Sequence, residues 1–192
     1  MGGQYFSSAG AFLISTIFGL YILAVMLRFL FQWARADFYN PVSQVIVKVT
    51  NPVLRPLRRI IPGWAGVDFA AVALMVALKC VELTLLFSLH GPKIPQVAGL
   101  LVLALAGLLS LLLNVFFFSI LIQVILSWVN PGHYNPVTQL LYQLNEPILR
   151  PARRLIPPLG GFDLSPIVAF VAIKLLEFLL VAPINDLGYQ LG

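Results

Sequence analysis

Two arginine- and proline-rich stretches contain half of the basic residues in this sequence. Each contains three arginines, and an aspartate follows after a glycine-containing turn. Guanidinium groups bind carboxylates and phosphates through paired hydrogen bonds, which suits an acidic protein segment or an anionic lipid headgroup. The same arginines can instead fix membrane orientation and meet anionic lipid without specificity. The candidate lipid- or partner-binding residues are Arg55, Arg58, Arg59, Arg150, Arg153 and Arg154.

Two pairs of opposite charges interrupt apolar runs: Lys79 with Glu82, and Lys174 with Glu177. A spacing of three places both members of a pair on one face of a helix. A charge near the middle of a membrane span costs about 2.5–3.5 kcal/mol on insertion scales, so each charge requires a partner. Pairing within one helix and cross-pairing between the two halves of the chain are both open. The pairs can form a lock that joins the spans, or a midplane site for an ion or a proton.

A second set of polar residues lies near these pairs or at the ends of apolar runs. Asp68 and Asp163 each precede an apolar run, where they are expected to cap a helix or to pair with a nearby arginine. A titrating site at the membrane entrance is the alternative for these aspartates. Arg28 and Gln123, together with Asn114, are expected to extend a polar seam along the Lys–Glu pairs.

Signals for catalysis or cofactor binding are weak in this sequence. His90 and His133 fall in loops on opposite predicted sides of the membrane, and no metal-ligand spacing or phosphate-binding glycine loop is visible. Neither enzymatic activity nor a cofactor is expected. Direct nucleic-acid binding is not expected either, because the aromatic residues lie mostly in apolar runs and not beside the arginines.

The elements that position these residues are predicted to be membrane-spanning helices. Hydrophobic residues make up 60% of the 192-residue chain and charged residues 10%, against about 25% charged residues in a soluble domain. The first ten residues contain no lysine or arginine, so the first apolar run is expected to be a retained span and not a cleaved signal peptide. The predicted spans are residues 11–34, 69–89, 97–129 and 164–181.

For two of these spans, the sequence also predicts where the helix is interrupted or ends. The run over 97–129 would make a helix of about 50 Å, so it is expected to tilt, to project from the membrane or to break near Gly107 or Asn114. Pro183 is expected to end the last span.

A short amphipathic helix is predicted between the two spans of each half. The first begins at Asn40-Pro41, an N-cap followed by proline at the first helical position. Its apolar residues recur at helical spacing, and the second helix repeats the pattern. Pro56 and Pro151 are expected to break these helices into elbows, with a short turn restarting at each proline. The apolar positions are Val42, Val45, Ile46 and Val49, and then Val137, Leu140, Leu141 and Leu144.

The second half of the chain repeats the first at a constant offset of 95 residues. Arg58 corresponds to Arg153, and Lys79 corresponds to Lys174. We therefore predict two tandem repeats, over 11–90 and 97–184. The basic loops are expected in the cytoplasm and both termini outside, which gives two parallel repeats about an axis along the membrane normal. This symmetry would bring the six arginines into one composite surface.

At the paired pattern NP…LRP.RR.IP…G.D, the sequence resembles the YggT family of small bacterial membrane proteins, which includes YlmG proteins and plastid relatives. The resemblance extends from about Tyr21 to Glu177. The second copy ends in the family's Asp-Leu-Ser-Pro at 163–166, whereas the first copy reads Asp-Phe-Ala-Ala at 68–71. The resemblance implies an inner-membrane location. It also implies links with osmotic tolerance and potassium uptake, with cell division, or with cytochrome b assembly in plastids.

The residues and the resemblance together predict an all-α, multi-pass membrane protein that acts as a non-enzymatic assembly or organising factor. Its expected partners are anionic lipid headgroups and a membrane or cytoplasmic protein, and a homo-oligomer is an open alternative. The competing hypothesis is a transporter, channel or transport accessory for potassium or protons. A wet cavity lined by the midplane charges would favour transport, and charges sealed in pairs would favour the assembly role.

Overall fold

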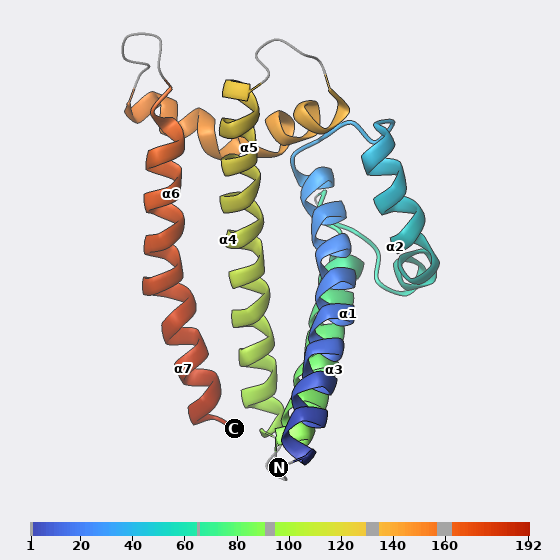
Figure 1. Cartoon of the computed structure of the whole chain (residues 1–192). Helices are drawn as coiled ribbons and strands as arrows, with labels where there is room; N and C mark the ends of the chain where they lie inside the picture. Colours follow the sequence, from blue (N-terminus) through green and yellow to red (C-terminus); the bar gives the residue numbers. More distant parts are fainter. Residues whose placement is uncertain (1, 65, 91–94, 130–134, 157–162) are drawn as a thin grey trace.

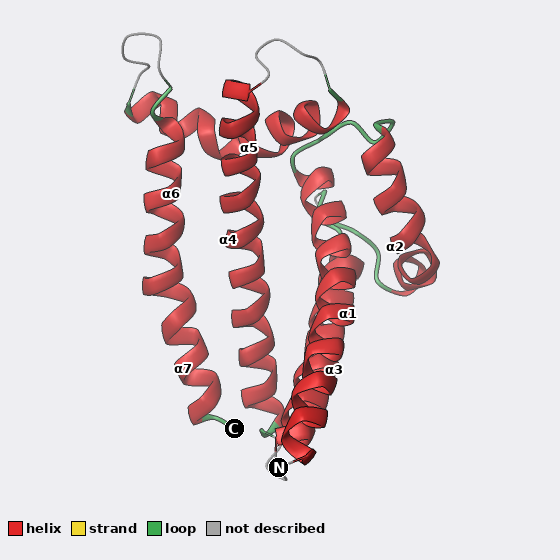
Figure 2. Ribbon diagram, in the orientation of Figure 1, coloured by secondary structure: helices red, strands yellow, loops and turns green. Residues whose placement is uncertain are grey.

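The computed structural model describes residues 2–64, 66–90, 95–129, 135–156 and 163–192, so His133 lies outside the described residues. Every regular element in these ranges is a helix, and Trp64 and Val67 form an isolated bridge (Figures 1 and 2). Four helices among the described residues are long and apolar enough to cross a membrane. They are α1 (Gly2–Trp33), α3 (Phe69–His90), α4 (Val97–Val129), and a last span built from α6 (Ser165–Leu176), η1 (Glu177–Val181) and α7 (Ala182–Gln190).

Two further helices, α2 (Pro41–Ile60) and α5 (Pro136–Leu155), connect the spans of each half. Each begins at an asparagine whose side-chain oxygen accepts the backbone N–H two residues later, at 3.0 Å. The proline that follows the asparagine has no N–H to satisfy, and its fixed φ favours the first helical turn. The sequence signal for both helix starts therefore has a direct structural basis.

The prolines inside α2 and α5 bend these helices without breaking them. The prediction of a break at Pro56 and Pro151 is wrong, because α2 continues to Ile60 and α5 to Leu155. Figure 1 shows the first turns of α2 from the side and its last turns end-on, so the helix axis changes direction. A proline removes one backbone hydrogen bond and displaces the preceding turn, while the bonds on either side hold the helix together.

The central helix α4 runs without interruption over 33 residues. It does not break at Gly107 or at Asn114, the two positions considered from the sequence. The side-chain amide of Asn114 donates to the backbone oxygen of Ser110, 2.9 Å away and one turn earlier. This bond satisfies a polar group inside the helix without disturbing the backbone ladder.

The last span continues past Pro183, so the prediction that this proline ends it is wrong. Residues 177–181 form a π-helical turn, in which the N–H of Ala182 bonds to the backbone oxygen of Glu177, five residues earlier. A π turn accommodates one extra residue in a helix and rearranges its hydrogen bonds. The wider turn lies directly before Pro183, where a regular ladder would lack one N–H donor.

The spans pack as two pairs that meet in the middle of the bundle, with α1 against α3, α4 against α7, and α3 against α4. The start of α4 lies close to the C-terminal region, because a Cβ built on Gly99 would lie 2.7 Å from the backbone oxygen of Gly188. Both termini lie at one end of the bundle, and α5 lies at the other (Figure 1).

Candidate functional site

One arginine of each basic stretch is bonded to the aspartate ten residues later. Arg58 Nε donates to Asp68 Oδ2 at 3.2 Å, and a terminal nitrogen of the same guanidinium also contacts Oδ2. Arg153 Nε donates to Asp163 Oδ2 at 3.0 Å. These pairs join the end of α2 to the start of α3, and the end of α5 to the start of α6. The two repeats therefore use the same charge pair at the same junction.

The two aspartates also act as caps for the helices that follow them. Asp68 Oδ1 accepts the N–H of Ala71 at 3.3 Å, and Asp163 Oδ1 accepts the N–H of Ser165 at 2.9 Å. The capping role and the arginine-pairing role, which the sequence left as alternatives, occur together in each carboxylate. Partial burial raises the pKa of Asp163, but hydrogen bonds from Ser165 and Arg153 outweigh it, so the pKa lies below its ordinary value.

The remaining arginines of the two stretches point outward. Arg55, Arg59, Arg150 and Arg154 are exposed, whereas Arg58 and Arg153 are partly buried. The second stretch also contains an acid: Glu146 lies 3.4 Å from Arg150 Nε and 2.9 Å from Arg153 Nη1. Each repeat thus uses one arginine as an internal anchor and leaves two exposed.

The six arginines do not form the composite surface expected from symmetry. Figure 1 shows α2 running along the flank of the bundle beside α1, while α5 lies across the end of the bundle. The arginine-bearing ends of these two helices therefore lie on opposite sides of the molecule. The offset of 95 residues preserves the local contacts but not the direction in which the connecting helix lies.

The Lys–Glu pairs form within single helices. Lys79 Nζ lies 3.0 Å from Glu82 Oε2, and Lys174 Nζ lies 2.6 Å from Glu177 Oε2. No contact between Lys79 and Glu177, or between Lys174 and Glu82, is present in the described residues. The pairs are therefore not the direct ion-pair lock between repeats that cross-pairing would make.

The two pairs have different surroundings. The side chains of Lys79 and Glu82 are 22% and 5% exposed, whereas those of Lys174 and Glu177 are 49% and 30% exposed. Lys79 packs against α4, where a Cβ built on Gly107 would lie 2.8 Å from Lys79 Cε. On the second pair, Lys174 Nζ lies 5.3 Å from the centre of the Phe117 ring, which gives a cation–π contact on one side.

A buried polar contact that the sequence pattern did not predict joins α1 to α2. Arg28 is buried, and its guanidinium donates to the Thr50 hydroxyl at 2.7 Å and contacts the backbone oxygen of Val47 at 3.5 Å. Arg28 therefore lies against the connecting helix and does not extend a seam along the Lys–Glu pairs. Burial of this charge is offset by a charge-assisted hydrogen bond.

The second repeat makes the equivalent contact with neutral groups. The amide of Asn145 on α5 donates to Gln123 Oε1 at 2.8 Å, and its oxygen accepts the Ser119 hydroxyl at 2.6 Å. Gln123 corresponds to Arg28, and Asn145 corresponds to Thr50, at the same offset of 95 residues. Polar residues thus occur at equivalent positions in both repeats, and this pattern was the sequence signal that could have revealed both contacts.

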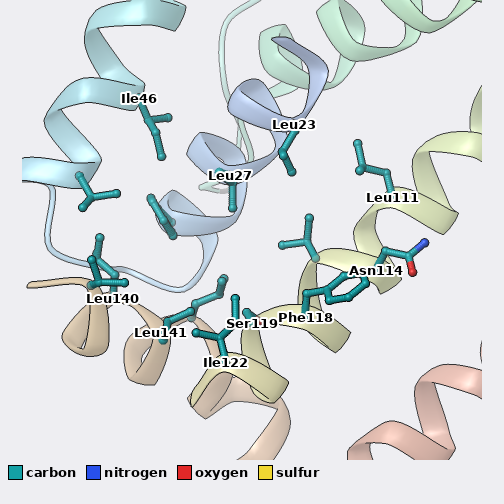
Figure 3. A pocket seen from close by; sticks show the side chains of 15 residues that line it. Leu23, Leu27, Ile46, Leu111, Asn114, Phe118, Ser119, Ile122, Leu140 and Leu141 are labelled. Carbon is teal, nitrogen blue, oxygen red and sulfur yellow. The ribbon is translucent and has the colours of Figure 1, made fainter. Parts of the chain in front are cut away.

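An apolar groove of about 440 Å³ lies between α1, α2, α4 and α5 (Figure 3). Leu27 on α1, Ile46 on α2 and Leu140 on α5 line it, together with Leu111 and Phe118 of α4. Asn114 also borders the groove, but Figure 3 shows its amide pointing away, so the wall is almost entirely apolar. A groove of this volume and chemistry can take an acyl chain or an apolar side of another helix. Among the described residues, no group of three or more His, Cys, Asp or Glu side chains could hold a metal ion.

Comparisons with known proteins show similarity over almost the whole chain. An uncharacterized protein of Pseudomonas aeruginosa is 48% identical over 187 residues, which cover 97% of this chain and 93% of the relative. The uncharacterized protein YggT of Escherichia coli K12 is 41% identical over 160 residues, which cover 82% of this chain and 81% of the relative. No solved structure matches the chain significantly.

A plant relative has a more informative name but matches a smaller region. The chloroplast protein CCB3 of Arabidopsis thaliana, which is named for cofactor assembly, is 35% identical over 78 residues, which cover 40% of this chain and 45% of the relative. The family model described as CCB3/YggT matches twice, over residues 7–89 and 102–184. These two matches fit a tandem repeat of two spans each. Because they cover most of both halves, the chain belongs to the CCB3/YggT family.

Proposed function

We propose that the protein is a non-enzymatic assembly or organising factor of the inner membrane, with both termini outside and with α5 and the start of α2 on the cytoplasmic side. The observation that carries the proposal is the division of roles among the arginines. Arg58 and Arg153 are held internally by aspartates, whereas the other four are exposed. The exposed arginines form two platforms, one of Arg55 and Arg59 and one of Arg150 and Arg154.

The chemistry around the first platform supports contact with anionic lipid. A shallow pocket on α2 is lined by Lys48, Asn51, Pro52 and Arg55, so two cationic side chains flank one depression. Exposed apolar residues, including Val45 and Ile60, lie on the same helix. A helix that offers cations and apolar side chains to its surroundings suits the boundary between headgroups and acyl chains.

The name of the plant relative supports the proposal that this protein helps to assemble another protein. That relative is named for cofactor assembly. By analogy, the client of this protein would be another membrane protein, held by an arginine platform through an acidic segment. Binding by exposed arginines requires no catalytic group and no resident cofactor.

The test uses a variant in which all four platform arginines, Arg55, Arg59, Arg150 and Arg154, are changed to glutamine. The purified variant should retain several-fold less anionic phospholipid than the native chain, with phosphatidylglycerol as the probe and phosphatidylcholine as the comparison, in native mass spectrometry. When native membranes are crosslinked, the variant should also lose the covalent adducts that the native chain forms with other proteins. A reporter fused to either terminus serves as the topology control. Inverted topology would mean that the arginines only orient the chain, and unchanged lipid retention would contradict the platform.

Ion transport, the alternative function, has less support from the site geometry. Each intramembrane lysine is bonded to a glutamate on its own helix, and the pair at Lys79 is covered by α4. Flux measurements on liposomes with the purified protein reconstituted in their bilayer distinguish a transporter from an assembly factor. Potassium or proton flux that disappears in Glu82→Gln or Glu177→Gln would favour transport over the assembly role.

A further inference from the structure

The two Lys–Glu pairs occupy equivalent positions in the repeats but differ in what covers them. Lys79 and Glu82 lie between α3 and α4, and Glu82 is buried. Lys174 and Glu177 are about half and one-third exposed, in a helix that is apolar enough to span a membrane. Charges open to hydrocarbon are costly, and intramembrane charges normally face protein or water. The second pair therefore lacks the protein cover that the first pair has.

The helix that covers the first pair indicates what is missing from the second. Lys79 is covered at Gly107 of α4, the first span of the second repeat. At the offset of 95 residues, α4 corresponds to α1, and Gly107 corresponds to Phe12. An equivalent cover for Lys174 would thus be a helix of the α1 type, placed with Phe12 near the level of the lysine.

Within this chain, α1 is not available for that position. It packs against α3 and α2, whereas α6 and α7 form the opposite edge of the bundle (Figure 1). In the described residues α6 contacts α4, α5 and η1 and no helix of the first repeat. The outer face of the last span also carries exposed apolar residues around the charges, including Val171, Phe178 and Leu179.

We propose that a second copy of this chain covers the Lys174–Glu177 pair with its own α1. The outer face of α1 is free for such a contact, because Phe12, Leu13, Ile17 and Leu20 are all more than half exposed. Copies inserted in the same direction present α1 antiparallel to α6, as α4 is antiparallel to α3. Two different faces then meet, so the contact is heterologous and extends to a closed ring or a chain of copies.

The contact also has a specific chemistry at the lysine. Lys174 Nζ already lies over the ring of Phe117 on one side, at 5.3 Å from its centre. Phe12 of the second copy would bring a second aromatic ring to the open side of the same ammonium group. Aromatic rings stabilise a desolvated cation more strongly than an exposed one, which suits a lysine enclosed between two copies.

The test is pairwise crosslinking of full-length chains in native membranes. Cys80, the single native cysteine, is first replaced by serine. One tagged copy then carries Leu13→Cys, which leaves the Phe12 ring in place, and a differently tagged copy carries Phe178→Cys; a short bis-maleimide is added. The matched control pairs Leu13→Cys with Leu105→Cys, an exposed position on α4 two residues before Gly107.

The expected result is a covalent dimer containing both tags, formed at least fivefold more with Phe178→Cys than with Leu105→Cys. Equal yields for the two pairs would overturn the proposal. So would a product containing only Phe178→Cys copies, which indicates a face-to-face contact, or an adduct between Phe178→Cys and a different protein.

Counting copies in the membrane gives a second, independent measurement. Photobleaching of a fluorescent fusion in native nanodiscs should show two or more steps per particle, and particles with a single step only would overturn the proposal. The inference does not depend on the arginine platforms. The glutamine variant of those platforms should leave the crosslink unchanged, so failure of one proposal is distinguishable from failure of the other.

Discussion

The guanidinium of Arg28 on α1 and the hydroxyl of Thr50 on α2 are joined by a buried hydrogen bond of 2.7 Å. Thr50 also donates to the backbone oxygen of Ile46 at 2.7 Å, so its hydroxyl links the arginine to the backbone of α2. This contact holds the connecting helix against the first span. It explains how a charged residue is tolerated inside an otherwise apolar helix.

Replacement of Thr50 by valine should weaken this attachment. Valine keeps the side-chain shape but leaves the guanidinium of Arg28 without its closest acceptor, a loss of about 1–3 kcal/mol for a buried donor. The thermal midpoint of the detergent-solubilised protein should fall. Thr50→Ser, which retains the hydroxyl, is the matched control and should stay close to the native midpoint. A valine variant as stable as the serine variant would contradict the attachment role.

The neutral counterpart in the second repeat should be equally sensitive. Asn145 is fully buried and bonds both Gln123 and Ser119. Asn145→Leu leaves the Gln123 amide without this partner, whereas the Ser119 hydroxyl keeps its bond to the backbone oxygen of Phe116. We expect a loss of about 1–3 kcal/mol, measured by denaturant titration in detergent. The double variant Asn145→Leu/Gln123→Leu should recover part of the loss, because the second substitution removes the orphaned amide. Equal losses in the single and double variants would argue against the hydrogen bond.

Acid should loosen the junction between α5 and α6. The folded-state pKa of Asp163 lies below its ordinary value of 3.8, so the stabilisation is complete above that value and is lost as the pH falls through the folded-state pKa. The thermal midpoint should therefore decrease between about pH 5 and pH 2. The decrease should be smaller in Asp163→Asn, which has no carboxylate to protonate. Identical acid sensitivity in the native chain and this variant would exclude Asp163 as a source of the effect.

Two glycines of α4 should respond in opposite ways to substitution by alanine. Alanine improves helix propensity by about 1 kcal/mol at both positions. At Gly99 the new Cβ would meet backbone atoms of Gly188 and Gly192 at 2.7 Å, and backbone cannot give way without moving α7. At Gly107 it would meet the terminal methylene of Lys79, which can shift.

Gly99→Ala should therefore destabilise the protein by about 1–3 kcal/mol, as overpacking does, while Gly107→Ala should be neutral or slightly stabilising. Proteolysis of the C-terminal region provides a second readout, since only Gly99→Ala should loosen α7. Equal stability of the two variants would show that α4 and α7 do not approach as closely as the structure indicates.

The sequence alone was sufficient for the parts of the fold that depend on local pattern. Apolar runs of span length predicted the four long helices, and Asn-Pro signals predicted the starts of α2 and α5. The offset of 95 residues predicted two repeats, which fit the double family match. These features follow from the length, polarity and capping chemistry of short segments, which a sequence displays directly.

Only the tertiary structure decided where the polar side chains go. Arg28 bonds to Thr50 and not to a polar seam, because the direction of α2 against α1 determines which groups a long side chain can reach. The placement of the helices also determines that the two arginine platforms lie apart, that Lys79 is covered and that Lys174 is exposed. Repeated sequence specifies repeated local contacts. The surroundings of each repeat differ because α3 has α4 as a neighbour, while α6 lies at the edge of the bundle.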